Sequence, residues 1–218
     1  MRSALKYQRL MIVGLLASSL WSGYAVAGSQ DAAGSATNPA TDASSTLNQE
    51  PMTPERFREI AARPGDLVPL VPQLSQVPIW TNAAVTIVMK YASGRTATEQ
   101  VTQTAHTISG KYIVYTINSE LYHRTMNSIM AFDQKASALK VYGLYDDGHG
   151  GEVLTEAVVN YDFEIKAYSA TSTYGDGFKE VTTGSYTSLS DFSRTTVLKN
   201  GALFMIREVT VRPAPPSN

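Results

Sequence analysis

The sequence predicts a mainly β protein in which about ten antiparallel strands run up and down around one lipocalin-like barrel, preceded by one short helix. From Ile79 onward, β-branched and aromatic residues alternate with polar ones at period two, as in strands. Glycine-containing turns separate these segments at short intervals. Strands joined by so few residues pair antiparallel, and closing the sheet removes its exposed edges. Roughly ten such strands therefore predict a sandwich or a barrel, and the barrel is favoured.

Residues 1–27 have the pattern of a cleavable signal peptide. Basic residues precede an apolar run from Leu10 to Trp21, and an Ala-x-Ala cleavage site ends at Ala27. The apolar run is shorter than the roughly 20 residues that a transmembrane helix needs, so we expect no transmembrane segment after cleavage. The sequence contains 0 cysteines. An exported protein without disulfides fits the bacterial periplasm or a secreted bacterial product.

Composition and turn signals divide the rest of the chain. The sequence from Gly28 to Gln49 is rich in Ser, Ala, Thr and Gly and has too little apolar surface to fold. Together with the signal peptide, the expected segments are a flexible leader (28–52), a short helix with a proline-rich connector (53–78), the barrel (79–213) and a disordered tail (214–218).

Local signals define the one expected helix. Thr53 is a suitable N-cap, Pro54 suits the first helical position, and Pro64 ends the helix near Arg63. Phe57 and Ile60 lie three residues apart and share one helix face. We expect this face to dock against the mouth or the flank of the barrel.

The strand boundaries follow from the turns. Asn200-Gly201 is the clearest, because both residues tolerate the positive φ angles that a two-residue type I′ hairpin requires. Ser109-Gly110 and several Asp-Gly or Gly-Gly pairs mark other joints. The expected strands are 81–91, 97–108, 110–118, 124–132, 138–145, 152–161, 163–171, 178–187, 191–199 and 202–211.

The stretch from Ser128 to Pro213 resembles the DUF1579-like family of bacterial proteins of unknown function. The matching motifs are Phe132-Asp133-Gln134-Lys135, Val141 to Asp146, Thr183-Gly184-Ser185-Tyr186, and Leu189 to Arg194. Tyr145 stands where the family pattern has tryptophan. The resemblance implies a lipocalin-like or calycin-like barrel and implies no activity.

Charge and motifs disfavour several function classes. The 18 Lys and Arg balance 19 Asp and Glu, and no basic stripe favours nucleic acid as a partner. The 3 histidines share no metal-ligand spacing, and no nucleophile elbow or phosphate-binding glycine loop is present. We expect no metal and no cofactor. Whether the protein is an enzyme stays open, with a non-enzymatic role favoured.

The last hairpin supplies the candidate ligand site. A two-residue loop at Asn200-Gly201 places Leu198 opposite Leu203, Thr196 opposite Met205 and Arg194 opposite Arg207. If this face lines the cavity, the two arginines would bind a carboxylate or phosphate beside Met205. In the alternative, the face with Val197, Phe204 and Ile206 is the inner one, and the arginines meet solvent or neighbours such as Glu208.

The 12 tyrosines offer further candidates for a cavity wall, because a tyrosine combines apolar area with a polar tip. Tyr112 is the one we assign to ligand binding; plain packing is the alternative. The expected function is an exported, soluble barrel that binds a small, partly apolar and anionic ligand. The alternatives are an envelope accessory protein that acts through protein–protein contacts, and a barrel-fold hydrolase or isomerase that uses residues such as His123.

Overall fold

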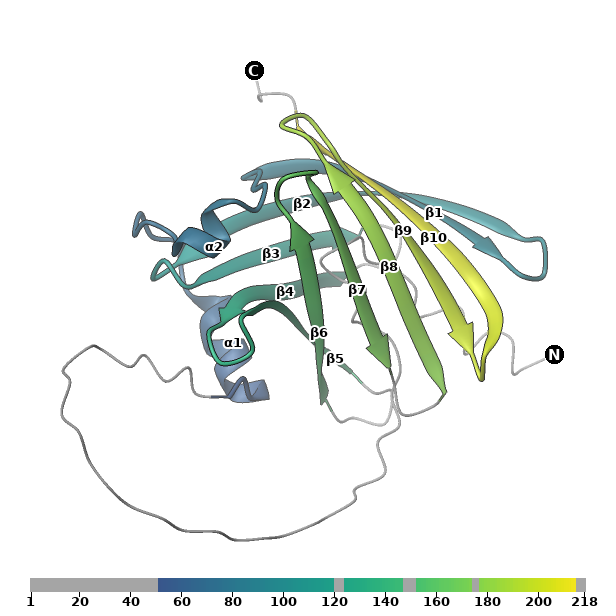
Figure 1. The fold of residues 1–218 in the computed structure, drawn as a ribbon, viewed down its shortest axis with the longest axis horizontal. Coiled ribbons are helices and arrows are strands. Elements are labelled where there is room, and N and C mark those ends of the chain that lie inside the picture. The colour runs from purple at the N-terminus through teal and green to yellow at the C-terminus, as the bar shows by residue number, and fades with distance from the viewer. Residues whose placement is uncertain (1–50, 120–123, 147–151, 174–176, 215–218) are drawn as a thin grey trace, which may run out of the picture.

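A computed structural model describes residues 51–119, 124–146, 152–173 and 177–214 (Figure 1). The expected signal peptide, nearly all of the expected leader, the glycine-rich turn at 147–151 and residues 215–218 of the expected tail lie outside the described residues.

The fold is a closed, antiparallel, up-and-down barrel of ten strands, which confirms the predicted fold class. Each strand pairs with its neighbours in the chain, and β1 closes the sheet against β10 (Figure 1). The strands are β1 (Asn82–Tyr91), β2 (Thr96–Ile108), β3 (Tyr112–Ser119), β4 (Arg124–Asp133), β5 (Ala138–Asp146), β6 (Glu152–Asp162), β7 (Ala167–Thr173), β8 (Phe178–Tyr186), β9 (Asp191–Lys199) and β10 (Ala202–Pro213).

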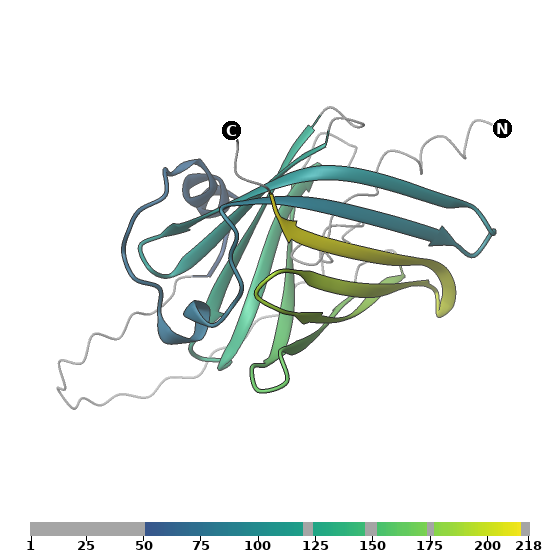
Figure 2. The ribbon, with the colours of Figure 1, turned by 90° about the horizontal axis from the view of Figure 1, so that it is seen from above.

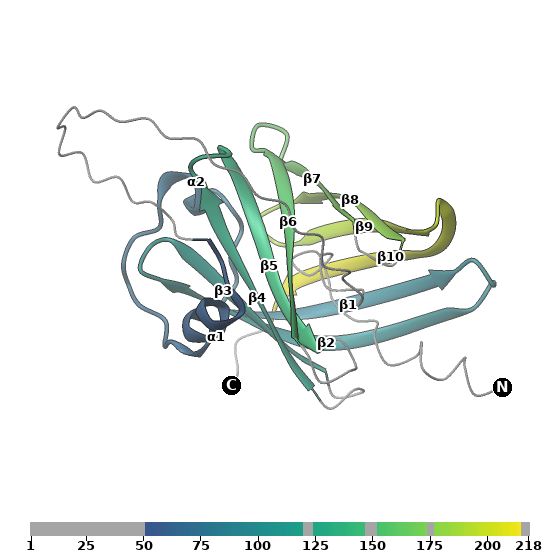
Figure 3. The same cartoon turned by 90° about the horizontal axis from the view of Figure 1, so that it is seen from below.

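Helix α1 (Pro54–Ala62) forms where the cap signals predict it. The Thr53 hydroxyl accepts a hydrogen bond from the Arg56 amide at 3.2 Å, which satisfies one of the unpaired N–H groups of the first turn. Phe57 and Ile60 are buried and pack on the outer face of the barrel in a cluster that includes Val114 and Ile129. The helix therefore docks on the flank of the barrel, beside β4 (Figure 3).

A second helix, α2 (Pro72–Ser75), lies in the connector, where the sequence predicts only irregular chain. Its Leu74 is fully buried, and Leu74 and Val77 pack with side chains such as Tyr115 and Met130 that point into the barrel. The helix thus closes the barrel end at which the β2–β3, β4–β5, β6–β7 and β8–β9 turns lie (Figure 2), and we call this the α2 end. In the described ranges, neither helix has the length and apolar character that a transmembrane helix requires.

Turn chemistry accounts for the strand boundaries. Asn200 and Gly201 have φ angles of 50° and 82°, and Ser109 and Gly110 have 54° and 66°, as a type I′ hairpin requires. Strand β7 begins at Ala167, later than expected. The Asp162 carboxylate accepts hydrogen bonds from the amides of Glu164 and Ile165 and holds this segment in a turn.

Candidate functional site

Buried polar side chains lie among the apolar ones in the barrel interior. Apolar and aromatic side chains fill the α2 end, whereas several buried polar side chains lie near the strand termini of the opposite end, which we call the far end. Burying polar groups costs free energy unless they find partners, so this lining is not what core packing alone would select. The buried polar side chains are Glu99, Gln103, Ser119, Ser128, Thr155, Ser172, Glu180, Thr182, Asp191, Ser193, Thr195 and Arg207.

An ion pair between Glu180 on β8 and Arg207 on β10 lies in this interior. The Arg207 Nη2 atom donates to the Glu180 Oε2 atom at 3.1 Å, across the intervening strand β9. The two side chains are only 3% and 6% exposed. The free energy needed to remove both charges from water is often larger than the attraction between them, so the pair is weak evidence for a stabilising role.

Arg207 retains donor capacity beyond this pair. Its Nε atom is buried and has no hydrogen-bond partner among the described residues. A guanidinium carries five N–H donors in a planar fork and binds carboxylates or phosphates through two of them at once. The guanidinium therefore has at least one buried donor, Nε, that the pair with Glu180 does not use.

Hydroxyl groups continue the polar surface next to Arg207. Arg207 lies opposite Thr195 on β9, which lies opposite Thr182 on β8. The two threonine hydroxyls are 2.9 Å apart and hydrogen-bonded. Hydroxyls act as both donors and acceptors, so this row can hydrogen-bond polar ligand atoms of either kind.

The expected pair of facing arginines does not form. Leu198 lies opposite Leu203, as predicted, but a register shift between Leu203 and Met205 places Met205 opposite Val197. From there on, the predicted register is wrong by one residue, and Arg194 lies opposite Glu208. Arg194 is exposed on the outer face, where its Nη1 atom is 3.6 Å from the Glu208 carboxylate.

The cause of the shift is a β-bulge at Phe204, which adds one residue to β10. The Phe204 ring packs edge-on against Tyr91 and Phe178, and its carbonyl accepts a hydrogen bond from the Ala92 amide at 3.0 Å. The bulge turns Met205 and Arg207 inward together. The outcome combines both expected alternatives: Met205 and Arg207 face the interior, as in the first, whereas Val197 also faces the interior and Arg194 meets Glu208 outside, as in the second.

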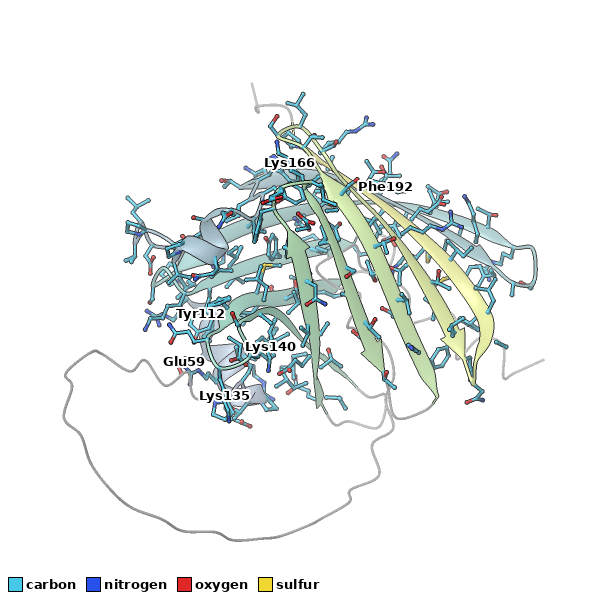
Figure 4. All side chains as sticks on the ribbon, in the orientation of Figure 1. Glu59, Tyr112, Lys135, Lys140, Lys166 and Phe192 are labelled. Atoms are coloured by element: carbon cyan, nitrogen blue, oxygen red, sulfur yellow. The ribbon has the colours of Figure 1, made fainter. Side chains whose placement is uncertain are left out.

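The other two predicted site residues, Met205 and Tyr112, lie on opposite faces of the barrel wall. Met205 is buried in the interior cluster that lines β1 and β10. Tyr112 lies on the outer face beneath α1, where its hydroxyl accepts a hydrogen bond from Arg56 Nη2 at 3.0 Å (Figure 4). Its strand neighbour Tyr115 faces the interior instead. Tyr112 is thus not part of the interior site.

A second polar centre occupies the α2 end. The Tyr168 hydroxyl donates to the Asp191 carboxylate at 2.6 Å, and the rings of Tyr161 and Tyr186 pack around Tyr168. Burial raises the pKa of Asp191 to about 6, although the hydrogen bond from Tyr168 opposes the shift. Burial, followed by the charge of Asp191, also raises the pKa of Tyr168 well above its usual range, so the phenol stays protonated.

The raised pKa of Asp191 makes folding stability depend on pH. The folded state holds the Asp191 proton more tightly than the unfolded chain does. Protonated Asp191 therefore stabilises the folded state fully below about pH 4, and this stabilisation is lost as pH rises through about 6. We expect Asp191→Asn to be more stable than the wild type at pH 7.5 by on the order of 2–3 kcal/mol, and to lose this advantage at pH 4. Urea unfolding of both proteins from pH 4 to 8 measures the difference.

Asp133→Asn is the matched control. Hydrogen bonds from the Ala136 amide and from Lys140 lower the pKa of Asp133, so its contribution has the opposite sign and is lost as pH falls. If the free energy of unfolding of Asp191→Asn changed with pH in parallel with that of the wild type, this would contradict a raised pKa of Asp191.

Sequence reasoning missed Glu180, Thr195, Tyr168 and Asp191. A signal for Glu180 exists, because period two places it on one face with Phe178 and Tyr186, where a carboxylate is out of place. No local signal links Glu180 to Arg207, since the two residues lie on strands that are not adjacent. Among the described residues, no three histidine or carboxylate side chains gather as metal ligands would.

Comparison with known proteins does not assign this chain to a family. No family model matches the sequence, so the resemblance to the DUF1579-like family is not confirmed. No curated protein matches it either. Among solved structures, the barrel is similar to a protein of unknown function from the DUF3598 family of Nostoc punctiforme, with a TM-score of 0.44 and 13% identity. The similarity covers 67% of this chain and 50% of that one, so the chain spans about half the length of its structural neighbour.

Proposed function

We propose that the chain is an exported β-barrel that binds a small, partly apolar ligand in its interior, with an anionic group of the ligand at Arg207. The observation that carries this proposal is the buried guanidinium of Arg207, whose Nε donor has no partner among the described residues. Apolar side chains such as Met89, Met205 and Phe178 pack in the same interior cluster and supply surface for an apolar ligand body.

The far end is the natural position for the head group. Glu180 and Ser172 lie near the far-end termini of their strands, and the interior row of Arg207, Thr195 and Thr182 lies next to them. The α2 end is packed with apolar and aromatic residues, including Leu74 from the closing helix. A ligand whose charged group lies near Arg207 would place its apolar part against the neighbouring cluster of Met89, Met205 and Phe178.

Export is part of the proposal and rests on the N-terminal sequence. We expect protein recovered from the periplasm or the culture medium to begin at Gly28, because the cleavage site ends at Ala27. Edman sequencing and intact mass measure this. Mature protein that still begins at Met1 would contradict export through signal cleavage.

Native mass spectrometry tests the binding proposal. Protein purified from its own host without denaturation should retain a small molecule that leaves on collisional activation. The double variant Arg207→Met with Glu180→Met, in which both charges are replaced, should lose this adduct while remaining folded. Arg194→Met is the control, because Arg194 lies on the outer face. An adduct-free wild type, or an adduct that the double variant retains fully, would refute the proposal.

A further inference from the structure

The outer face of the barrel has a hollow with a polar rim, separate from the interior. It lies over β10, β1, β2 and β3 and has a volume of about 640 Å³, within the range of roughly 300–1,000 Å³ that is typical of small-ligand sites. Its rim is formed by Thr86, Gln100, Thr102, Asn118, Thr210 and Arg212, and Ala84 lies among them. The interior residues Val85 and Val101 form the floor between the strands.

Strand register explains the shape of the hollow. One row across the sheet reads Arg212, Ala84, Thr102 and Asn118, and the next row begins with Thr210 and continues through Thr86 and Gln100. Ala84 is the one small side chain in these two rows. Because larger polar side chains flank Ala84 on both neighbouring strands, the surface is depressed above it.

The polar groups of the hollow are available to a ligand. The side chains of Thr86, Gln100, Thr102 and Thr210 make no hydrogen bond within the described part of the chain, and Arg212 makes no ion pair there. Asn118 uses its Oδ1 atom to accept from Thr125 at 2.8 Å, which leaves its amide N–H groups. The rim therefore offers hydroxyl and amide groups of both polarities and one cation, with no carboxylate in the lining.

An exposed aromatic ring adjoins the hollow. Phe192 on β9 lies directly opposite Thr210, and it points outward because its neighbours Asp191 and Ser193 are buried (Figure 4). Its side chain is 45% exposed. A pyranose sugar has an apolar C–H face and hydroxyl groups around its edge. Its apolar face can therefore pack on the Phe192 ring while its hydroxyls form hydrogen bonds with the adjacent threonines.

From this arrangement we propose that the outer hollow binds an acidic saccharide. Threonine, glutamine and asparagine side chains bond sugar hydroxyls, Phe192 supplies the apolar platform, and the exposed Arg212 pairs with a sugar carboxylate. The hydroxyl, amide and guanidinium groups of the rim favour a hydroxylated, anionic occupant over a purely apolar protein segment. This site is independent of the interior site, because its rim residues point away from the barrel lumen.

Isothermal titration of the full mature protein with oligosaccharides of galacturonate, glucuronate and sialate, and with neutral cello- and malto-oligosaccharides, tests the proposal. At least one acidic oligosaccharide should bind, and more tightly than the neutral ones. Arg212→Gln should weaken that binding at least tenfold, and Thr86→Val with Thr210→Val should weaken it as well. Valine keeps the β-branched shape of threonine and removes the hydroxyl, so the fold should persist.

Two controls separate this site from the rest of the molecule. Thr171→Val changes an exposed threonine on β7, across the barrel from the hollow, and should leave saccharide affinity unchanged. The Arg207→Met, Glu180→Met variant should also leave it unchanged, so failure of the interior proposal is distinguishable from failure of this one. Absence of binding by every acidic oligosaccharide, or affinity that Arg212→Gln and the threonine variants do not alter, would overturn the outer site.

Discussion

Arg207→Met should lower the free energy of unfolding by about 3–5 kcal/mol, because it removes the buried guanidinium that pairs with the Glu180 carboxylate. The double variant Arg207→Met, Glu180→Met should regain most of this loss, since replacing both charges removes both desolvation costs. Urea unfolding of the wild type, both single variants and the double variant gives the coupling free energy of the pair.

Arg194→Met is the matched control for the same measurement. Arg194 lies one strand away from Arg207 and meets Glu208 in a largely solvent-exposed pair, so its replacement should change stability by about 0–1 kcal/mol. Equal effects of Arg194→Met and Arg207→Met would contradict the burial of the Glu180–Arg207 pair. A double variant as stable as the wild type would mean that folding does not require these charges.

Gly184→Ala should destabilise the protein by about 2–6 kcal/mol. A Cβ at this position would overlap the ring of Tyr168, which lies directly opposite on β7. The ring would have to move, and its hydrogen bond to Asp191 would weaken or break. Overpacking costs about 1–3 kcal/mol, and leaving a buried polar group without its partner adds about 1–3 kcal/mol.

A double-mutant cycle isolates the cause of the Gly184 effect. In a Tyr168→Ala background the overlapping ring is gone, so Gly184→Ala should lower the free energy of unfolding only slightly. Thermal or urea unfolding of the four proteins provides the comparison. If Gly184→Ala costs the same in both backgrounds, the ring contact is not its cause.

The strands were predictable because local chemistry determines their turns. Asn200-Gly201 and Ser109-Gly110 adopt the positive φ angles that their sequence indicates, and the cap at Thr53 begins α1 where expected. Helix α2 was not predictable in this way. It is a single short turn in a proline-rich connector, and it is stabilised by burying Leu74 against residues from distant strands.

The candidate site was only partly predictable. Alternation along a strand separates two faces, but it does not tell which face is inner, and Tyr112 proved to be on the outer one. The bulge at Phe204 depends on contacts with Tyr91 and Phe178 from other strands, so turn chemistry at Asn200-Gly201 could not reveal it. One extra residue replaced the expected Arg194–Arg207 pair by two separate ion pairs, with Glu208 and with Glu180.

The most direct test of the interior site compares two fluorescent probes that differ only in charge, dansylaminoundecanoate and its uncharged primary amide. In fluorescence titrations the carboxylate should bind the wild type about 10–100-fold more tightly than the amide, because charged hydrogen bonds contribute about 1.5–3 kcal/mol. This preference should persist in Arg194→Met and vanish in the folded Arg207→Met, Glu180→Met variant. Equal affinity of both probes for the wild type, or an undiminished preference in the double variant, would contradict an anion site at Arg207.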